Sequence, residues 1–171
     1  MRGRLIALEG GEASGKTTQA AILARRLDAV LTREPGGTPV GERVRSLLLD
    51  AKVTSLDAKA EALLMAADRA QHVAEVIGPA LEAGRHVVTD RYAHSSLAYQ
   101  GHGRGLPVDE VSRVSEWAAG GLWPDVVVLV DVPEDVARRR RAGSDRFELE
   151  ERAFHRRVAD GYHQLVAEDP D

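Results

Sequence analysis

The sequence of 171 residues contains no cysteine, which excludes a disulfide framework and a thiolate metal site. The six histidines show no paired ligand spacing, so we expect no structural metal. The apolar runs fall far short of the roughly 20 residues that cross a bilayer. Residues 1–4 lead directly into a short apolar run, without the longer apolar segment and cleavage site of a secretory signal. We therefore expect a cytoplasmic protein with no membrane partner.

An overall excess of positive charge is also lacking, since the net charge is -4. That balance argues against nonspecific nucleic-acid binding, which needs a net basic face. The positive charge is instead local, in four consecutive arginines from Arg138 to Arg141 with Arg146 close behind. This run fits either a solvated helix face or an anion-binding segment. With 43% hydrophobic and 29% charged residues, the chain has the composition and length of one globular domain.

The clearest motif lies at residues 10–17, which fit the phosphate-binding loop pattern GxxxxGK[ST] between a strand-like run and a helix-like one. Glycines let successive backbone N–H groups turn inward into an anion-binding nest, and the following helix adds its positive end. Lys16 is expected to reach the outer phosphates of a nucleoside triphosphate, and the Thr17 hydroxyl to ligate Mg²⁺. The residues expected to bind this nucleotide are Gly10, Gly11, Glu12, Ala13, Ser14, Gly15, Lys16, Thr17 and Thr18.

The apolar spacing alternates between strand-like and helix-like segments. Strands are predicted at 5–8, 29–32, 86–89 and 126–130, and helices at 17–27, 40–49, 56–83, 109–118, 134–142 and 148–167. Gly78-Pro79 can kink or divide the third helix. The alternation predicts an α/β fold in which helices flank a parallel sheet, with ligands beyond the carboxyl ends of the strands.

Several segments, taken in order, resemble the thymidylate kinases, which phosphorylate dTMP to dTDP with ATP. The matching segments are residues 8–19, 32–38 (Thr-Arg-Glu-Pro-Gly-Gly-Thr), 67–73 (Ala-Asp-Arg-Ala-Gln-His-Val), 90–92, 95–96, 98–101 (Ala-Tyr-Gln-Gly) and the arginine-rich stretch ending at 145–148. The resemblance implies a three-layer P-loop nucleoside monophosphate kinase fold, one domain over 1–171 with a lid at about 137–147, Mg²⁺ as cofactor, and a homodimer. The family usually continues past the last helix with a strand and a helix, whereas this sequence stops at Asp171, and the sequence leaves open whether it is truncated.

The resemblance assigns Arg33 and Arg91 to the monophosphate of dTMP, because the guanidinium fork matches phosphate oxygens in pairs. Two structural alternatives stay open, namely a salt bridge of Arg33 with Glu34 and an ion pair of Arg91 with Asp90. Beside Thr17, Asp90 is the expected metal-positioning residue and is favoured over Asp131.

The resemblance assigns Arg69 to a thymine carbonyl, a position at which cytosine presents an amino donor instead. A helix carboxylate as the i,i+4 partner of Arg69 is the alternative. Met65 replaces the family's phenylalanine, so we expect looser stacking on the base, with a simple core role as the alternative. Ser95 and Ser96 are expected at the base edge, and Gln100 in the same substrate site.

The resemblance assigns Glu12 to the sugar 3′-hydroxyl, with an outward, solvated side chain as the alternative, and Tyr99 to exclusion of a 2′-hydroxyl. The loop itself carries no arginine between Glu12 and Gly15, so the lid is expected to supply catalytic charge alongside Lys16 and Arg91. The lid candidates are Arg139, Arg141 and Arg146, with a one-residue register ambiguity toward Arg138 and Arg140.

Two other function classes remain as alternatives. Another deoxynucleoside or nucleoside monophosphate kinase of the same fold would share the loop and the lid. A nucleotide-dependent switch is disfavoured, because the sequence has no Asn-Lys-x-Asp guanine-reading motif and has arginines at two separate phosphate sites.

Overall fold

The computed structural model describes residues 1–141, 143 and 145–168. Its centre is a parallel sheet with the strand order β2-β3-β1-β4. The strands are β1 (Leu5–Glu9), β2 (Val30–Arg33), β3 (Val87–Asp90) and β4 (Val126–Leu129). All four predicted strands are confirmed within one residue at either end. In the register, Asp90 lies beside Leu8 on one side and Arg33 on the other, so the carboxyl ends of three strands meet at one edge.

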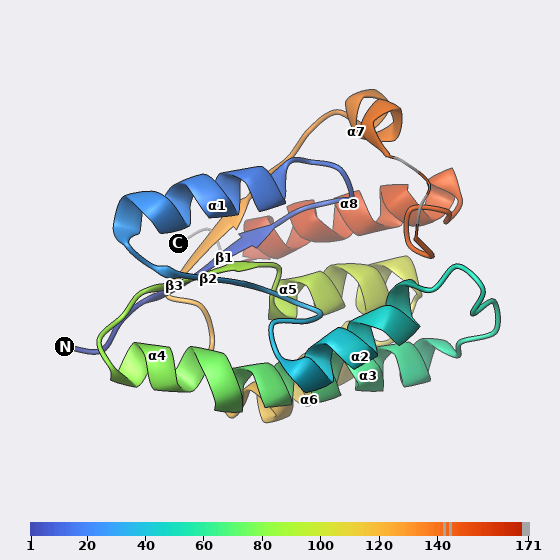
Figure 1. Ribbon diagram of the computed structural model, residues 1–171. Helices are drawn as coiled ribbons and strands as arrows, with labels where there is room; N and C mark the ends of the chain where they lie inside the picture. The colour runs from blue at the N-terminus through green and yellow to red at the C-terminus, as the bar shows by residue number, and fades with distance from the viewer. Residues whose placement is uncertain (142, 144, 169–171) are drawn as a thin grey trace.

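Helices cover both faces of the sheet, as Figure 1 shows with α1 (Lys16–Leu27) on one side and α4 (Gly78–Glu82) and α6 (Val108–Ala119) on the other. Successive strand residues point to opposite faces. Accordingly Leu8 packs with Ala20 and Ala24 of α1, while Leu5 packs with Leu81 of α4 and Ala119 of α6. The three-layer α/β architecture is confirmed.

The predicted helix at 56–83 is continuous but changes its winding. It consists of α3 (Ala58–His72), a π-helical stretch η1 (Val73–Ile77) and then α4. The Gly78 N–H bonds to the Val73 carbonyl, and this wider turn accommodates Pro79, which can donate no hydrogen bond. Before it, α2 (Pro39–Leu49) begins at Thr38, whose side chain accepts a hydrogen bond from Gly41 N–H.

A helical segment between β3 and α6 was not predicted. It comprises α5 (Ala93–Ser96) and the π-helical η2 (Leu97–Gly103), and η2 packs along α8 (Arg152–Glu168). Glycines obscure its periodicity in the sequence, but the packing requires them. A Cβ on Gly103 would lie 2.8 Å from Phe154, and one on Gly161 would lie 2.7 Å from His102. Close contact between η2 and α8 therefore explains these glycines.

The segment predicted to form the lid follows β4. Its helix α7 spans Glu134–Arg140, and the end predicted at Ala142 lies outside the described residues, as does Ser144 within the predicted lid. The predicted start of the last helix at residue 148 was too early. Asp145 Oδ1 accepts the N–H groups of Phe147 and Glu148, which forms a separate turn before α8 begins at Arg152. None of the described helices is both long and apolar enough to cross a membrane.

Candidate functional site

The loop between β1 and α1 adopts a conformation that depends on glycine. Gly10 and Gly15 have φ angles of 142° and 100°, which side-chain-bearing residues rarely adopt. A Cβ on Gly10 would lie 2.3 Å from the Val130 carbonyl oxygen. Lys16 Nζ crosses the loop and donates to the Gly11 carbonyl at 2.6 Å and to Ser14 Oγ at 3.2 Å. Burial, together with the charge of Arg91, lowers the pKa of Lys16 to about 8.

Thr17 and Asp90 bring a hydroxyl and a carboxylate together at the end of the sheet. The Thr17 hydroxyl donates to Asp90 Oδ2 at 2.5 Å. Among the described residues no three or more histidines and acidic residues form a metal-binding cluster. A hydroxyl and one carboxylate fit Mg²⁺ bound with a triphosphate, because that ion keeps water and phosphate oxygens as most of its ligands.

Arg91 lies at the centre of a polar cluster. Its Nη2 donates to Glu12 Oε1 at 2.7 Å and to the Tyr99 hydroxyl at 2.9 Å, and its Nη1 donates to the Gly10 carbonyl at 2.9 Å. Tyr99 in turn donates to Glu12 at 2.7 Å. The ion pair of Arg91 with Asp90 is thus wrong, because Arg91 pairs with Glu12. The outward, solvated side chain considered for Glu12 is also wrong, because only 19% of that side chain is exposed.

The charge state of Glu12 follows from these contacts. Burial alone would raise the pKa of Glu12, but the charges of Arg91 and Lys16 and the hydrogen bond from Tyr99 lower it below its ordinary value. Glu12 is therefore an anion at neutral pH. It can accept hydrogen bonds but cannot donate them.

Arg33, at the end of β2, pairs with Glu42 at 3.0 Å and not with Glu34. Its side chain is half exposed. It lines a cavity at the phosphate loop, which we call the loop cavity. The residues that line the loop cavity are Glu12, Ala13, Gly15, Lys16, Thr17, Thr18, Arg33, Glu34, Arg45, Asp90, Arg91, Arg140 and Glu148.

A second cavity, the inner cavity, adjoins the first and encloses about 530 Å³, part of it open to solvent. Glu12, Glu34, Arg45 and Arg91 line both cavities. The predicted substrate residues that meet in the inner cavity are Glu12, Met65, Arg69, Arg91, Ser95, Ser96, Tyr99 and Gln100. Residues from three separate stretches of the sequence therefore come together here, with Arg33 in the adjoining loop cavity.

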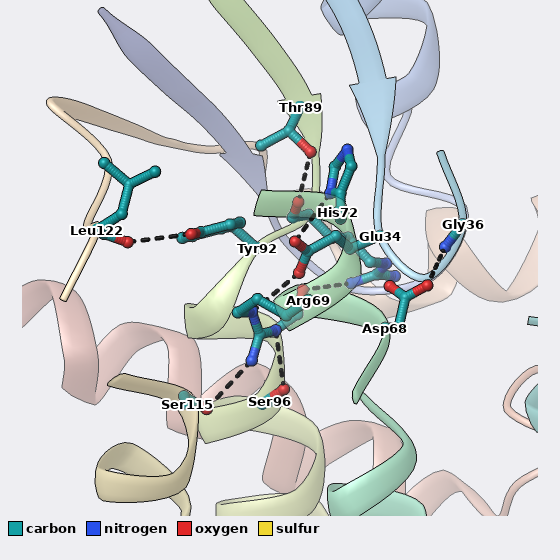
Figure 2. A network of polar contacts seen from close by, with 12 residues as sticks. Glu34, Gly36, Asp68, Arg69, His72, Thr89, Tyr92, Ser96, Ser115 and Leu122 are labelled. Carbon is teal, nitrogen blue, oxygen red and sulfur yellow. Dashed lines mark hydrogen bonds and ion pairs between the residues drawn. The ribbon is translucent and has the colours of Figure 1, made fainter. Parts of the chain in front are cut away.

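Arg69 is almost fully buried, with 2% of its side chain exposed (Figure 2). Its Nε donates to Glu34 at 2.9 Å, and its two terminal nitrogens donate to Ser115 and Ser96 at 3.2 and 3.1 Å. The other oxygen of Glu34 lies 3.0 Å from His72 Nδ1. The i,i+4 alternative is wrong, since the partner carboxylate comes from the end of β2. A guanidinium has five N–H groups, so one donor remains on each terminal nitrogen.

Sequence reasoning missed two polar residues that build the site. Glu9 is 1% exposed, accepts the Tyr92 N–H at 2.8 Å, and accepts the hydroxyls of Ser95 and Tyr162 at 2.6 and 3.0 Å. It therefore holds the segment that carries Arg91. Its position at the end of β1 was the available signal. Arg45 of α2 lines both cavities and donates to the Pro35 carbonyl at 2.9 Å.

The lid arginines are placed differently from one another. Arg139 is 69% exposed and pairs with Asp135 at 2.7 Å, and Arg141 pairs with Glu134 at 2.9 Å. The Arg146 guanidinium donates to the Leu48 carbonyl at 3.0 Å. Among the described lid arginines Arg140, left open by the sequence register, lines the loop cavity. The catalytic assignments of Arg139, Arg141 and Arg146 stay predictions, and the place of Arg140 in the loop cavity favours the alternative register that includes Arg140.

Three comparisons with known proteins identify one family. The profile of the family described as thymidylate kinase matches residues 8–171. The thymidylate kinase of Halothermothrix orenii is 52% identical over an alignment that covers 99% of this chain and 86% of the relative. That of Chromobacterium violaceum is 50% identical, with 99% and 83% covered. The crystal structure of thymidylate kinase from Ehrlichia chaffeensis superposes with a TM-score of 0.84 at 32% identity, covering 99% of this chain and 90% of that one. The chain therefore belongs to the thymidylate kinase family.

Proposed function

We propose that this protein transfers the γ-phosphoryl group of ATP to dTMP, yielding ADP and dTDP. The observation that carries the proposal is the pair of adjoining cavities that share Arg91 and Glu12. One cavity contains the phosphate loop, and the other contains Arg69 with its two unused donors. Such an arrangement suits two substrates whose phosphates meet, whereas a nucleotide switch needs one nucleotide site.

On the donor side, the backbone N–H groups of the loop and the Lys16 ammonium hold the β- and γ-phosphates. Thr17 and Asp90 are the residues that would hold Mg²⁺, which when bound neutralises charge on the phosphate oxygens. In this structure Lys16 donates hydrogen bonds to Gly11 and Ser14. When ATP binds, phosphate oxygens replace these two acceptors.

On the acceptor side, Arg91 and Arg33 hold the monophosphate of dTMP, and Arg45 adds a third positive charge between the cavities. Tyr99, which contacts Glu12, lies against the deoxyribose and excludes a 2′-hydroxyl. The free donors of Arg69 bind a thymine carbonyl. In this way the protein selects a deoxynucleoside monophosphate with a thymine-like base.

We also assign the whole of residues 1–171 to one kinase domain with its lid at 137–147. The lid supplies positive charge to the transferred phosphoryl group. A reaction in the cytoplasm and a homodimer complete the proposal. An apolar groove between α3 and α6, which includes Leu63, Val111 and Val114, supports self-association. A monomeric mass in equilibrium sedimentation at micromolar protein concentration would contradict the proposed homodimer.

The substrate proposal is tested by a coupled assay that offers ATP with Mg²⁺ and each of dTMP, dUMP, dCMP, TMP and thymidine. We expect the highest kcat/KM with dTMP, weak activity with dCMP because Arg69 meets an amino group, and little activity with thymidine because Arg91 and Arg33 lack their phosphate. Equal or better turnover of thymidine would instead favour a deoxynucleoside kinase. Equal or better turnover of dCMP would contradict thymidylate specificity.

A further inference from the structure

Glu61 on α3 is a buried carboxylate outside the cavity, with 0% of its side chain exposed. It accepts hydrogen bonds from Arg104 at 3.1 Å and 3.2 Å, and its Oε2 lies 2.7 Å from a terminal nitrogen of Arg146, a charge contact rather than an aligned hydrogen bond. Its Oε1 also accepts Gln100 Nε2 at 2.8 Å. One carboxylate thus connects two positive charges with a residue of the inner cavity.

The contact with Glu61 fixes the orientation of the Gln100 amide. A carboxylate paired with guanidinium groups can only accept hydrogen bonds, so the NH₂ group of Gln100 must face it. The amide oxygen must then face the other way. In the described structure Gln100 is 1% exposed and lines the inner cavity, and its Oε1 is buried without a hydrogen-bond partner. A buried acceptor without a partner is costly, so a ligand donor is expected to satisfy it.

Base chemistry supplies the matching donor. Thymine and uracil carry an N–H group at ring position three, whereas cytosine has a bare acceptor nitrogen there. A cavity that presents an amide oxygen accepts the first two bases and rejects the third. We propose that Glu61 is a positioning residue for base selection, which keeps the Gln100 amide oxygen turned toward the inner cavity. This inference rests on the proposed function and identifies how that site rejects cytosine.

The substitution Glu61→Gln tests the proposal because it should reverse the Gln100 amide. Arg104 and Arg146 both need an acceptor, so the oxygen of the introduced amide turns to them and its NH₂ group turns to Gln100. Gln100 then presents its own NH₂ group to the cavity, which suits the bare nitrogen of cytosine. We expect the ratio of kcat/KM for dTMP over dCMP to fall about tenfold. The ratio of dTMP over dUMP should stay unchanged, since both bases carry the same N–H group.

Two controls separate positioning from general damage. Glu150→Gln also removes a carboxylate partner of Arg104, but Glu150 is not one of the described residues that line the inner cavity. It should leave both ratios unchanged. In a Gln100→Ala background, Glu61→Gln should no longer change the dTMP over dCMP ratio, because it acts through the missing amide. A change of the same size in that background would contradict the proposal.

Folding does not limit the test. Removing one charge of a buried ion pair can destabilise a protein, so a second variant combines Glu61→Gln with Arg104→Gln, which restores the net charge of the cluster, with Glu150 losing its ion pair to Arg104. The same tenfold fall is expected in this variant. An unchanged dTMP over dCMP ratio in a folded variant overturns the role of Glu61, while a wild-type enzyme that shows no preference for dTMP overturns the proposed function instead.

Discussion

Replacing Lys16 by methionine should lower kcat for dTDP formation by about a thousandfold, the largest loss expected from a single side chain in the phosphate loop. Lys16 is 5% exposed and already lies across the loop, so its charge is positioned before the nucleotide arrives. Methionine has a similar length but no charge, and it removes the electrostatic contribution without opening the loop. Steady-state rates with saturating dTMP measure the effect.

The pH dependence provides an independent check on Lys16. Because its pKa is lowered to about 8, the free enzyme loses this charge as the pH rises through that value. We expect kcat/KM for ATP to fall above about pH 8 in the wild type, while kcat stays level because bound triphosphate keeps the ammonium protonated. In Lys16→Met the fall should be absent. Lys52→Met, at an exposed position, is the matched control and should behave as wild type.

The variant should also fold. Between about pH 8 and the ordinary lysine value of 10.5, the unfolded chain binds the Lys16 proton more tightly than the folded protein does. Stability therefore rises with pH in this window, and the buried ammonium is unfavourable for folding below it. Removing it should leave the midpoint of thermal unfolding at neutral pH unchanged or raise it. A rate loss with a lowered midpoint would instead point to a damaged loop.

Arg140→Ala should lower kcat by about a thousandfold or more, as for an internal arginine finger, and leave the KM for dTMP nearly unchanged. Arg140 lines the loop cavity together with Lys16 and Asp90, where we expect charge to develop on the transferred phosphoryl group. Arg139→Ala is the matched control, because that neighbour is exposed and pairs with Asp135 within its own helix. We expect it to lose little activity.

The remaining lid arginines decide the register. Arg141 lines a separate cavity together with Gly11 and Glu12, and Arg146 forms an ion pair with Glu61. A larger loss of kcat in Arg139→Ala or Arg141→Ala than in Arg140→Ala would support the register predicted from the sequence, in which Arg139 and Arg141 are the catalytic lid residues. Normal kcat in all four alanine variants, at positions 139, 140, 141 and 146, would remove the lid from catalysis.

The phosphate loop and the strand ends could be predicted from the sequence because each depends on a short, contiguous pattern. The pairing of side chains could not. Arg33 and Glu34 are neighbours at the end of a strand, and successive side chains there point to opposite faces, so Arg33 instead meets Glu42 and Glu34 meets Arg69.

Long-range contacts account for what sequence reasoning missed. Tyr162 reaches Glu9 across 153 positions, and Glu61 reaches Gln100 across 39. No local pattern signals such contacts, because the first joins α8 to the end of β1 and the second joins α3 to η2. In the sequence, the glycines of η2 interrupt the helical apolar pattern. In the structure, Gly103 allows η2 to pack closely against α8.

The contact of Arg91 with Glu12 has a thermodynamic consequence for ligands that resemble only part of the substrate. A phosphate that takes Arg91 weakens the strongest ion pair of Glu12, a group with 19% of its side chain exposed. An ion such as inorganic phosphate offers no hydroxyl in return, so the loss is not offset. A nucleotide that binds Arg91 through its phosphate and Glu12 through its sugar offsets it. We therefore expect the two ends of the substrate to bind cooperatively, and each fragment alone to bind more weakly than the number of its contacts would predict.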